Sequence, residues 1–136
     1  MAQSVLVIAE SGSGKSTSIR NLNPSETVII NIANKPLPFK GWKSKYTALD
    51  KENPKGNLLS VSSGPGVLKA MLHVSEKMPH IKNLVIDDWQ YMSSFEYFDK
   101  AAESYTQAQL DRKAKSEAYL DEEEITINQK IKNNWI

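Results

Sequence analysis

The 136-residue sequence contains no cysteine, which excludes disulfide bonds, a thiol nucleophile and any zinc or iron–sulfur site built on thiolates. Long apolar runs are also missing, since the longest, Val5–Ala9 and Thr27–Ile32, are far below the roughly 20 residues that a membrane-spanning helix needs. The segment Met1–Ser4 lacks the basic stretch of a secretion signal. We therefore expect one intracellular, cytoplasmic globular core and no membrane segment.

Arginine is scarce, because Arg20 and Arg112 are the only arginines among 17 cationic residues. Bidentate phosphate clamps are usually built from arginine, so this chain can form few of them. The formal net charge of +1 conceals an asymmetry: residues 1–86 are basic and residues 87–136 acidic. Six lysines lie between Lys35 and Lys55, which indicates a surface for an anionic ligand.

The alternation of apolar runs with glycine and proline predicts an α/β fold with a parallel sheet flanked by helices. Continuous apolar or β-branched runs predict strands at Ser4–Ala9, Thr27–Ile32, Asn57–Ser62 and Asn83–Asp88. Helical spacing and capping signals predict helices at Lys15–Leu22, at 67–78, from Ser93 past Ala118, and in a short final stretch at 127–135, after an acidic run at Asp121–Glu124.

These elements divide the chain into a nucleotide-binding core at residues 1–98 and a charged helical C-terminal segment at residues 99–136. Asn34–Gly56 contains three prolines and little periodicity, so we expect a long loop there. The apolar residues after residue 99 are too sparse for a sustained heptad, and no coiled coil is expected.

The strongest motif is Ala9–Thr17, with the sequence AESGSGKST, which we call the glycine-rich loop. It matches the phosphate-binding pattern GxxxxGK[ST] at every fixed position except the first, where alanine replaces glycine. Glycines allow backbone N–H groups to turn toward phosphate oxygens, and a following helix presents its positive end to the anion. The residues expected to bind the nucleotide are Glu10, Ser11, Gly12, Ser13, Gly14, Lys15, Ser16 and Thr17.

Within this loop, Lys15 can reach the β- and γ-phosphates and the Ser16 hydroxyl can ligate Mg²⁺. A Mg²⁺ site also needs a carboxylate at the end of a neighbouring strand. Asp87 meets that need at the end of an apolar run, and Asp88 follows it, placed to orient or deprotonate a water molecule with help from Gln90. An alternative role for Asp88 is to cap the turn after the strand.

At three places the sequence resembles phage-encoded P-loop ATPases of the AAA/RecA-like type: Ala9–Thr17, Asn31–Gly41 and Val85–Tyr91. The similarity covers about residues 3–98. It implies a P-loop NTPase-like fold, ATP and Mg²⁺ as cofactors, and ATP hydrolysis in phage DNA metabolism, in recombination or single-strand annealing, within the host cytoplasm.

The chain departs from this group in two respects. The group usually has glutamate where Asp88 stands, so hydrolysis is expected to be slow. It also has further strands after the acidic one, including a strand inserted between the two motif strands, and Ile125–Ile127 is the only later candidate here. The strand set is therefore expected to be incomplete. Either the chain is truncated relative to its relatives, or the two motif strands are adjacent, as in P-loop kinases and GTPases.

A catalytic arginine accelerates phosphoryl transfer by about 10³ to 10⁵. We expect Arg20, on the predicted first helix, and Arg112, in the charged C-terminal segment, to be solvated. Any such arginine is therefore expected from another copy in a homo-oligomer or from a partner protein. His73 and His80 have no neighbours at ligand spacing, so we expect both to be structural or solvated.

The loop at residues 35–56 interleaves lysines with aromatic residues. Single-stranded DNA is commonly held by such a mixture, and the candidate contacts are Lys35, Phe39, Lys40, Trp42 and Lys43. The alternative is that the aromatic side chains pack the loop onto the core while the lysines are solvated.

Three functions are compatible with these features. The first is a Mg²⁺-dependent ATPase that uses Lys15, Asp88 and Gln90 in catalysis and Ser16 and Asp87 for the metal. The second is a nucleotide-binding scaffold or regulatory module with little or no hydrolysis. The third is a P-loop kinase of small molecules, which is disfavoured because its lid normally needs several arginines.

Overall fold

The computed structural model describes residues 2–92 and 107–134, with residues 124–134 described as backbone alone. The expected helical residues 93–106, and the final residues 135–136, lie outside this part of the chain. Within it, no helix is both long enough and apolar enough to cross a membrane.

The centre of the fold is a parallel three-stranded sheet in the order β2-β1-β3. β1 (Thr27–Asn31) lies between β2 (Leu58–Leu59) and β3 (Asn83–Asp87), with Ile29 opposite Leu58 on one side and Val85 on the other. Every residue of β1 is buried, as its continuous β-branched run predicts. The α/β class with a parallel sheet is thus confirmed, although β2 is shorter than the predicted Asn57–Ser62.

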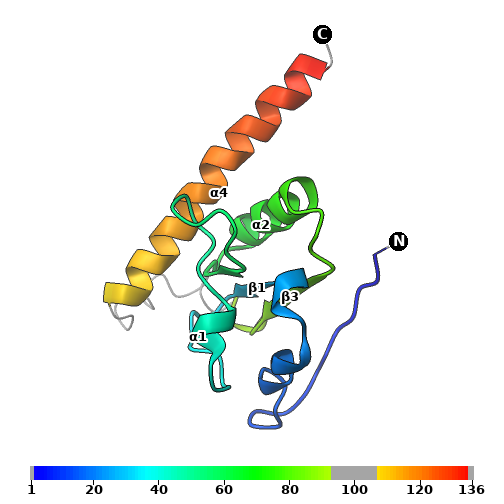
Figure 1. Cartoon of the computed structure of the whole chain (residues 1–136), viewed down its shortest axis with the longest axis vertical. Helices are drawn as coiled ribbons and strands as arrows, with labels where there is room; N and C mark the ends of the chain where they lie inside the picture. Colours follow the sequence, from blue (N-terminus) through cyan, green and yellow to red (C-terminus); the bar gives the residue numbers. More distant parts are fainter. Residues whose placement is uncertain (1, 93–106, 135–136) are drawn as a thin grey trace.

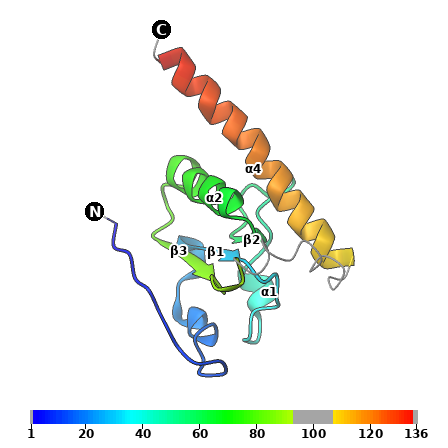
Figure 2. The ribbon, with the colours of Figure 1, turned by 180° about the vertical axis from the view of Figure 1, so that it is seen from behind.

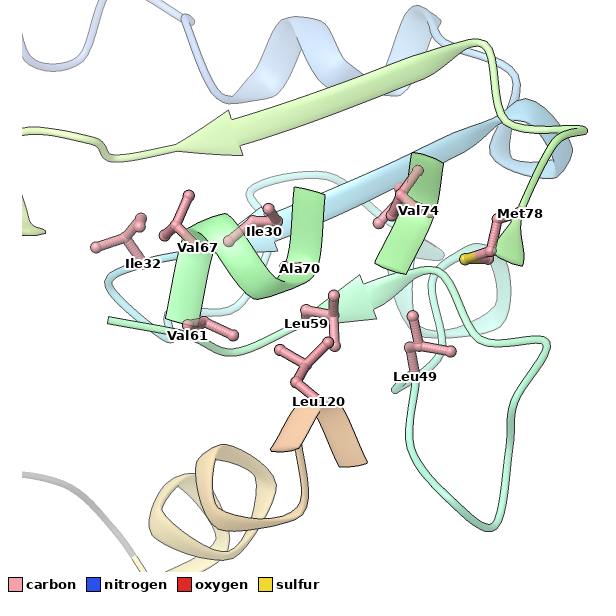
Figure 3. Packing of buried hydrophobic residues seen from close by; sticks show 11 residues of the cluster. Ile30, Ile32, Leu49, Leu59, Val61, Val67, Ala70, Val74, Met78 and Leu120 are labelled. Carbon is pink, nitrogen blue, oxygen red and sulfur yellow. The ribbon is translucent and has the colours of Figure 1, made fainter. Parts of the chain in front are cut away.

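One face of the sheet is covered by α2 (Gly64–Lys77), which confirms the helix expected at 67–78. The helix begins where the Ser63 hydroxyl accepts a hydrogen bond from the Gly66 backbone N–H, and it ends before Pro79. Figure 3 shows Val67, Ala70 and Val74 of α2 beside Ile30 of the sheet and Leu120 of the C-terminal helix. These apolar side chains form the larger of two buried clusters.

The opposite face is covered by the chain between residues 34 and 56. This segment is mostly loop, as expected, and includes the short helix α1 (Trp42–Lys45). Leu37 and Tyr46 are buried against Ile29 of β1, together with Ile19 from the segment after the glycine-rich loop. The sheet is therefore covered on both faces, as Figures 1 and 2 show from opposite sides.

The predicted first strand, Ser4–Ala9, is wrong for this structure. The segment is extended and lies outside the described sheet, and Val5, Leu6 and Ile8 are 80%, 80% and 85% exposed. Figure 2 shows it leading away from the core toward the N-terminus. A strand buried on both faces needs a hydrogen-bonding partner and two covering layers, and the described residues provide neither for this run. The alternative in which the two motif strands are adjacent is therefore not present among the described residues.

The predicted α-helix at Lys15–Leu22 is also wrong, because the chain forms a different type of helix there. The chain instead forms a five-residue 3₁₀ helix, η1 (Thr17–Asn21), and a second short 3₁₀ turn, η2 (Pro24–Glu26). The Ser18 hydroxyl donates a hydrogen bond to the Lys15 carbonyl at 2.6 Å, a local bond that competes with helix propagation, and Pro24 prevents extension. The positive end of a long helix is consequently absent behind the glycine-rich loop.

The C-terminal helix, α4 (Gln107–Asn134), continues without a break through the acidic run. The predicted interruption at Asp121–Glu124, a separate final helix and a strand at Ile125–Ile127 are therefore wrong. Three lysines from other elements pair with this run, Lys51 with Glu122, Lys69 with Asp121 and Lys77 with Glu123. These pairs, with Leu120 buried against α2, dock the helix onto the core, and its later turns extend beyond α2 in Figure 1.

Candidate functional site

A single hydrogen bond joins the two sequence motifs. The Ser16 hydroxyl donates to Oδ1 of Asp87 at 2.8 Å, across 71 residues of sequence. Asp87 is the last residue of β3, and the glycine-rich loop lies over the carboxyl end of that strand. The fold therefore places the predicted Mg²⁺ ligands within contact of one another.

A hollow of about 380 Å³ surrounds this hydrogen bond, within the range of roughly 300–1,000 Å³ typical of small-molecule sites. It is formed by the glycine-rich loop, the end of β3 and the loop that follows β1. Its lining includes every predicted nucleotide contact except Ser13, namely Glu10, Ser11, Gly12, Gly14, Lys15, Ser16 and Thr17, together with Ala9. From the other two segments come Lys35, Pro36, Pro38, Asp87, Asp88, Gln90 and Tyr91.

The conformation of the glycine-rich loop depends on its glycines. Gly12 and Gly14 have φ angles of +79° and +90°, which side chains with a Cβ rarely adopt. No atom lies within 4 Å of a Cβ built at either position, so the requirement for glycine here is conformational and not steric. Ser13, the predicted contact outside the lining, instead holds the turn, since its hydroxyl donates to the Glu10 carbonyl at 2.7 Å.

The electrostatics of Asp87 reflect its position under the loop. Burial raises the pKa of the Asp87 carboxyl, and the hydrogen bond from Ser16 lowers it. The neighbouring Asp88 charge raises the pKa further, whereas Lys15 lowers it. A carboxylate whose charge is disfavoured by burial is a suitable neighbour for a cation. Hydroxyl and carboxylate oxygens are the ligands that Mg²⁺ prefers, so the donor set of Ser16 and Asp87 fits that ion.

Asp88 and Gln90 lie in the turn after β3. Asp88 has a φ of +61°, in the left-handed region, and accepts a hydrogen bond from the Gln90 amide at 3.5 Å. Its backbone carbonyl also accepts from the Tyr91 N–H at 3.0 Å, which closes the turn. A strained residue at a strand end is often found at a functional site, and Asp88 is among the residues that line the hollow.

Neither arginine lines this hollow. Arg20 is exposed on η1, as expected. Arg112 is half-buried on α4, and its Nε is buried with no hydrogen-bond partner among the described residues, so the expectation of a fully solvated side chain is wrong there. The reason is that α4 packs against the core where a separate solvated helix was expected.

Lys35 belongs to the hollow and not to the aromatic surface with which the sequence grouped it. Its Nζ lies 4.6 Å from the centroid of the Tyr91 ring and 3.5 Å from the Tyr91 hydroxyl oxygen. Tyr91 was not among the predicted site residues, and its position four residues after Asp87, one turn from the strand end, is the signal that could have identified it.

The remaining nucleic-acid candidates lie on a neighbouring surface, where an open hollow of about 660 Å³ is lined by residues 37–44. Phe39 and Trp42 are half-buried and pack against the cluster that contains Tyr46, with the Phe39 and Tyr46 rings in an edge arrangement at 6.2 Å. Lys40 and Lys43 are exposed. The aromatic residues thus pack the loop onto the core, while a smaller part of the Phe39 and Trp42 surfaces remains accessible to a ligand.

The histidines lie away from these surfaces. His73 is buried between α2 and α4, 3.4 Å from the Tyr119 hydroxyl through Nε2, and His80 is exposed. In the described ranges, 2–92 and 107–123, no group of three or more His, Cys, Asp or Glu residues has the arrangement of a metal site. Both histidines therefore have the structural or solvated roles expected of them.

No protein-family model, curated protein or solved structure matches this chain.

Proposed function

We propose that this chain is a Mg²⁺-dependent ATP-binding protein of the P-loop NTPase type that hydrolyses ATP slowly. The observation that supports it best is the 2.8 Å hydrogen bond between Ser16 and Asp87, because it unites a phosphate-loop motif with an acidic strand end in one hollow. The resemblance to phage ATPases of recombination and single-strand annealing supports a role in phage DNA metabolism.

In this proposal the backbone N–H groups around Gly12 and Gly14 bind the phosphates, with Lys15 on the β- and γ-phosphates and Thr17 near the α-phosphate. Ser16 and Asp87 hold Mg²⁺, which neutralises charge on the phosphate oxygens when it is bound. Asp88 orients the attacking water and accepts its proton, and the Gln90 amide holds the Asp88 carboxylate in place.

Slow turnover follows from two features of the site. Asp88 is one methylene shorter than glutamate, and its carboxylate already accepts the Gln90 amide. Within the part of the chain that the structure describes, no arginine lines the hollow. Full activity therefore requires an arginine from another copy or from a partner. A scaffold that binds ATP without hydrolysis is the alternative that these same two features favour.

Phosphate release from ATP, measured with the wild-type chain, Lys15→Ala and Asp88→Ala, distinguishes these possibilities. We expect slow Mg²⁺-dependent release by the wild type, a loss of about 10²-fold or more in Asp88→Ala, and loss of both binding and release in Lys15→Ala. ATP binding without release by the wild type would establish the scaffold. Transfer of phosphate to a nucleoside would establish the kinase. Rapid multiple turnover by a strict monomer would contradict the need for a second chain.

The surface lined by residues 37–44 supports a second activity, the binding of single-stranded DNA. It combines the exposed Lys40 and Lys43 with the accessible parts of Phe39 and Trp42, and the Lys43 Nζ lies 5.8 Å from the Trp42 ring. Pro38 lines both this surface and the ATP hollow, so the two sites share a wall. Base stacking contributes about 1–3 kcal/mol per base, and lysines make the binding salt-dependent.

Fluorescence anisotropy with labelled single-stranded oligonucleotides tests this activity. We expect binding that weakens steeply between 50 and 200 mM salt, as phosphate contacts generally require, and that Trp42→Ala weakens by about tenfold. His80→Ala, at an exposed position just after the end of α2 that does not line the surface at residues 37–44, provides the control. Binding that neither salt nor Trp42→Ala changes would leave the aromatic residues with a packing role alone.

A further inference from the structure

We propose that Lys35 is the cation that distinguishes ATP from ADP at this site, by binding the γ-phosphate. The inference rests on the proposed ATP site. It assigns to Lys35 a role different from the DNA contact that the sequence indicates, and the reasons are its position, the fixed backbone around it and the weak interaction of its ammonium group.

The position of Lys35 follows from the topology of the sheet. Lys35 comes four residues after Asn31, the last residue of β1, and Asp87 is the last residue of the adjacent parallel strand β3. The carboxyl ends of parallel strands meet at one edge, so the loop after β1 faces the glycine-rich loop across the hollow. Lys15 and Lys35 therefore approach the hollow from two different walls.

The backbone at Lys35 and at the residue before it is held by hydrogen bonds from the side chains of the buried Asn31 and the half-buried Gln109. The Asn31 amide donates to the Lys35 carbonyl at 2.6 Å, and the Gln109 amide of α4 donates to the Asn34 carbonyl at 3.1 Å. Pro36 further restricts the chain. Such fixing reduces the entropy that Lys35 loses when it binds a ligand, which is the usual property of a preorganised contact.

Asn34 supplies the turn that directs Lys35 toward the hollow. It is buried with a φ of +53°, a conformation that asparagine tolerates better than most residues. Its side chain is bonded at both ends, since Oδ1 accepts from the Ser60 hydroxyl at 3.0 Å and Nδ2 donates to the Gln109 carbonyl at 2.9 Å. Two separate segments, the one that contains Ser60 and α4, thus hold one strained residue beside Lys35.

The ammonium group of Lys35 remains available for an anion. Its contacts are with the ring and hydroxyl of Tyr91, a neutral residue, and none of the ion pairs among the described residues includes it. Because Lys35 is exposed, its position over the half-buried Tyr91 ring gains little, about 0.5–1 kcal/mol, whereas hydrogen bonds between charged groups are stronger. A γ-phosphate in the hollow would therefore draw Lys35 away from Tyr91.

Titration calorimetry with Mg²⁺·ADP and with the Mg²⁺ complex of an ATP analogue whose β–γ bridge is an imido group tests this assignment. In Lys35→Met we expect the affinity for the triphosphate to fall about 10- to 100-fold, while the affinity for ADP changes by less than about twofold. Lys15→Met should weaken both ligands, and Lys55→Met, at an exposed lysine of the same 34–56 segment that lines neither the ATP hollow nor the surface at residues 37–44, should weaken neither. Lys35→Arg keeps the charge and should resemble the wild type more than Lys35→Met does.

The outcomes separate the two proposals. If the wild type binds neither nucleotide, the proposed ATP site is wrong and this role of Lys35 falls with it. If the wild type binds both and Lys35→Met weakens both equally or neither, the ATP site stands and the role of Lys35 is overturned. The Lys35 side chain is exposed, so Lys35→Met should melt within a few degrees of the wild type and can be compared directly with it.

Discussion

Asp87 carries a buried carboxylate, and burial disfavours its negative charge. The proposed site nevertheless requires a carboxylate oxygen of Asp87 as a ligand of Mg²⁺. Burial raises its pKa, so the folded chain binds the proton more tightly than the unfolded chain does. The free energy of unfolding therefore decreases as the pH rises through the interval between the unfolded and the folded pKa. At neutral pH the ionised Asp87 side chain lowers the free energy of unfolding. In the proposed site, the same ionised side chain serves as a ligand of Mg²⁺.

The substitution Asp87→Asn tests this conflict. Asparagine keeps the acceptor for the Ser16 hydroxyl and removes the charge, so we expect the melting temperature at pH 7.5 to equal or exceed that of the wild type. We also expect Mg²⁺ to lose its effect on ATP affinity. Thermal melting together with nucleotide titration measures both quantities, and a large drop in melting temperature would contradict this view of Asp87.

The contribution of Asn34 to stability can also be tested with substitutions at this one residue. Asn34→Ala removes its two side-chain bonds and keeps the strained φ, so we expect the free energy of unfolding to fall by about 1–3 kcal/mol. Asn34→Gly relieves the strain but also loses the bonds, and it should be less destabilising than Asn34→Ala. Urea denaturation measures both variants. Equal losses would show that backbone strain contributes nothing at this position.

At the scale of elements, Ser4–Ala9 and the sheet differ most in the exposure of their apolar side chains. Leu6 is 80% exposed, whereas Leu59 of β2 is fully buried. We expect Leu6→Ala to change the free energy of unfolding by less than about 0.5 kcal/mol and Leu59→Ala to reduce it by about 2–5 kcal/mol. If urea denaturation shows a comparable loss for Leu6→Ala, this segment packs as a buried strand in solution.

The contact between α2 and α4 contains His73, whose burial makes the stability of the fold depend on pH. Burial lowers the pKa of His73, Glu123 on α4 raises it, and Lys77 on α2 lowers it. The unfolded chain thus binds a proton more readily, so stability is complete above the ordinary pKa of about 6.5 and declines as the pH falls below it. Tyr119, whose ring meets that of His73 edge-on, is the remaining titratable neighbour.

We expect the wild-type free energy of unfolding to fall between pH 7.5 and 5.5, and His73→Gln to flatten this dependence. His80→Gln, at an exposed histidine outside the helix contact, should retain the wild-type dependence. Urea denaturation at the two pH values provides the comparison. Identical slopes for His73→Gln and the wild type would show that the burial of His73 does not govern the pH response.

At the scale of the whole molecule, the sequence was sufficient for two strands of the sheet, β1 and β3, and for the two motifs that meet beside them. Continuous apolar runs identify β1 and β3, and parallel strands necessarily bring Asp87 to the edge where the glycine-rich loop lies. The pairing of Ser16 with Asp87 follows from these two facts. Local patterns were adequate for β1, β3 and the glycine-rich loop because each is determined by residues close together in the sequence, whereas the bond between Ser16 and Asp87 spans 71 residues.

The features that the sequence did not predict depend on contacts between distant segments. An apolar run such as Ser4–Ala9 indicates a buried strand but cannot show whether a partner covers it. The acidic run of α4 indicates a break in the helix, but three lysines from two other segments pair with its carboxylates, one from the 34–56 segment and two from α2. Lys35 belongs by sequence to a basic loop, and the folding of that loop toward Tyr91 places it in the hollow.

The central claim is that the hollow at the end of β3 binds Mg²⁺·ATP. Calorimetric titration of the wild-type chain and of Lys15→Ala with ATP, in the presence and absence of Mg²⁺, tests it most directly, with Lys40→Ala as the matched control. We predict one saturable ATP site per chain that Mg²⁺ strengthens, that Lys15→Ala abolishes and that Lys40→Ala retains. A folded wild-type chain that binds no ATP, or a Lys15→Ala variant that binds it equally well, would contradict the claim.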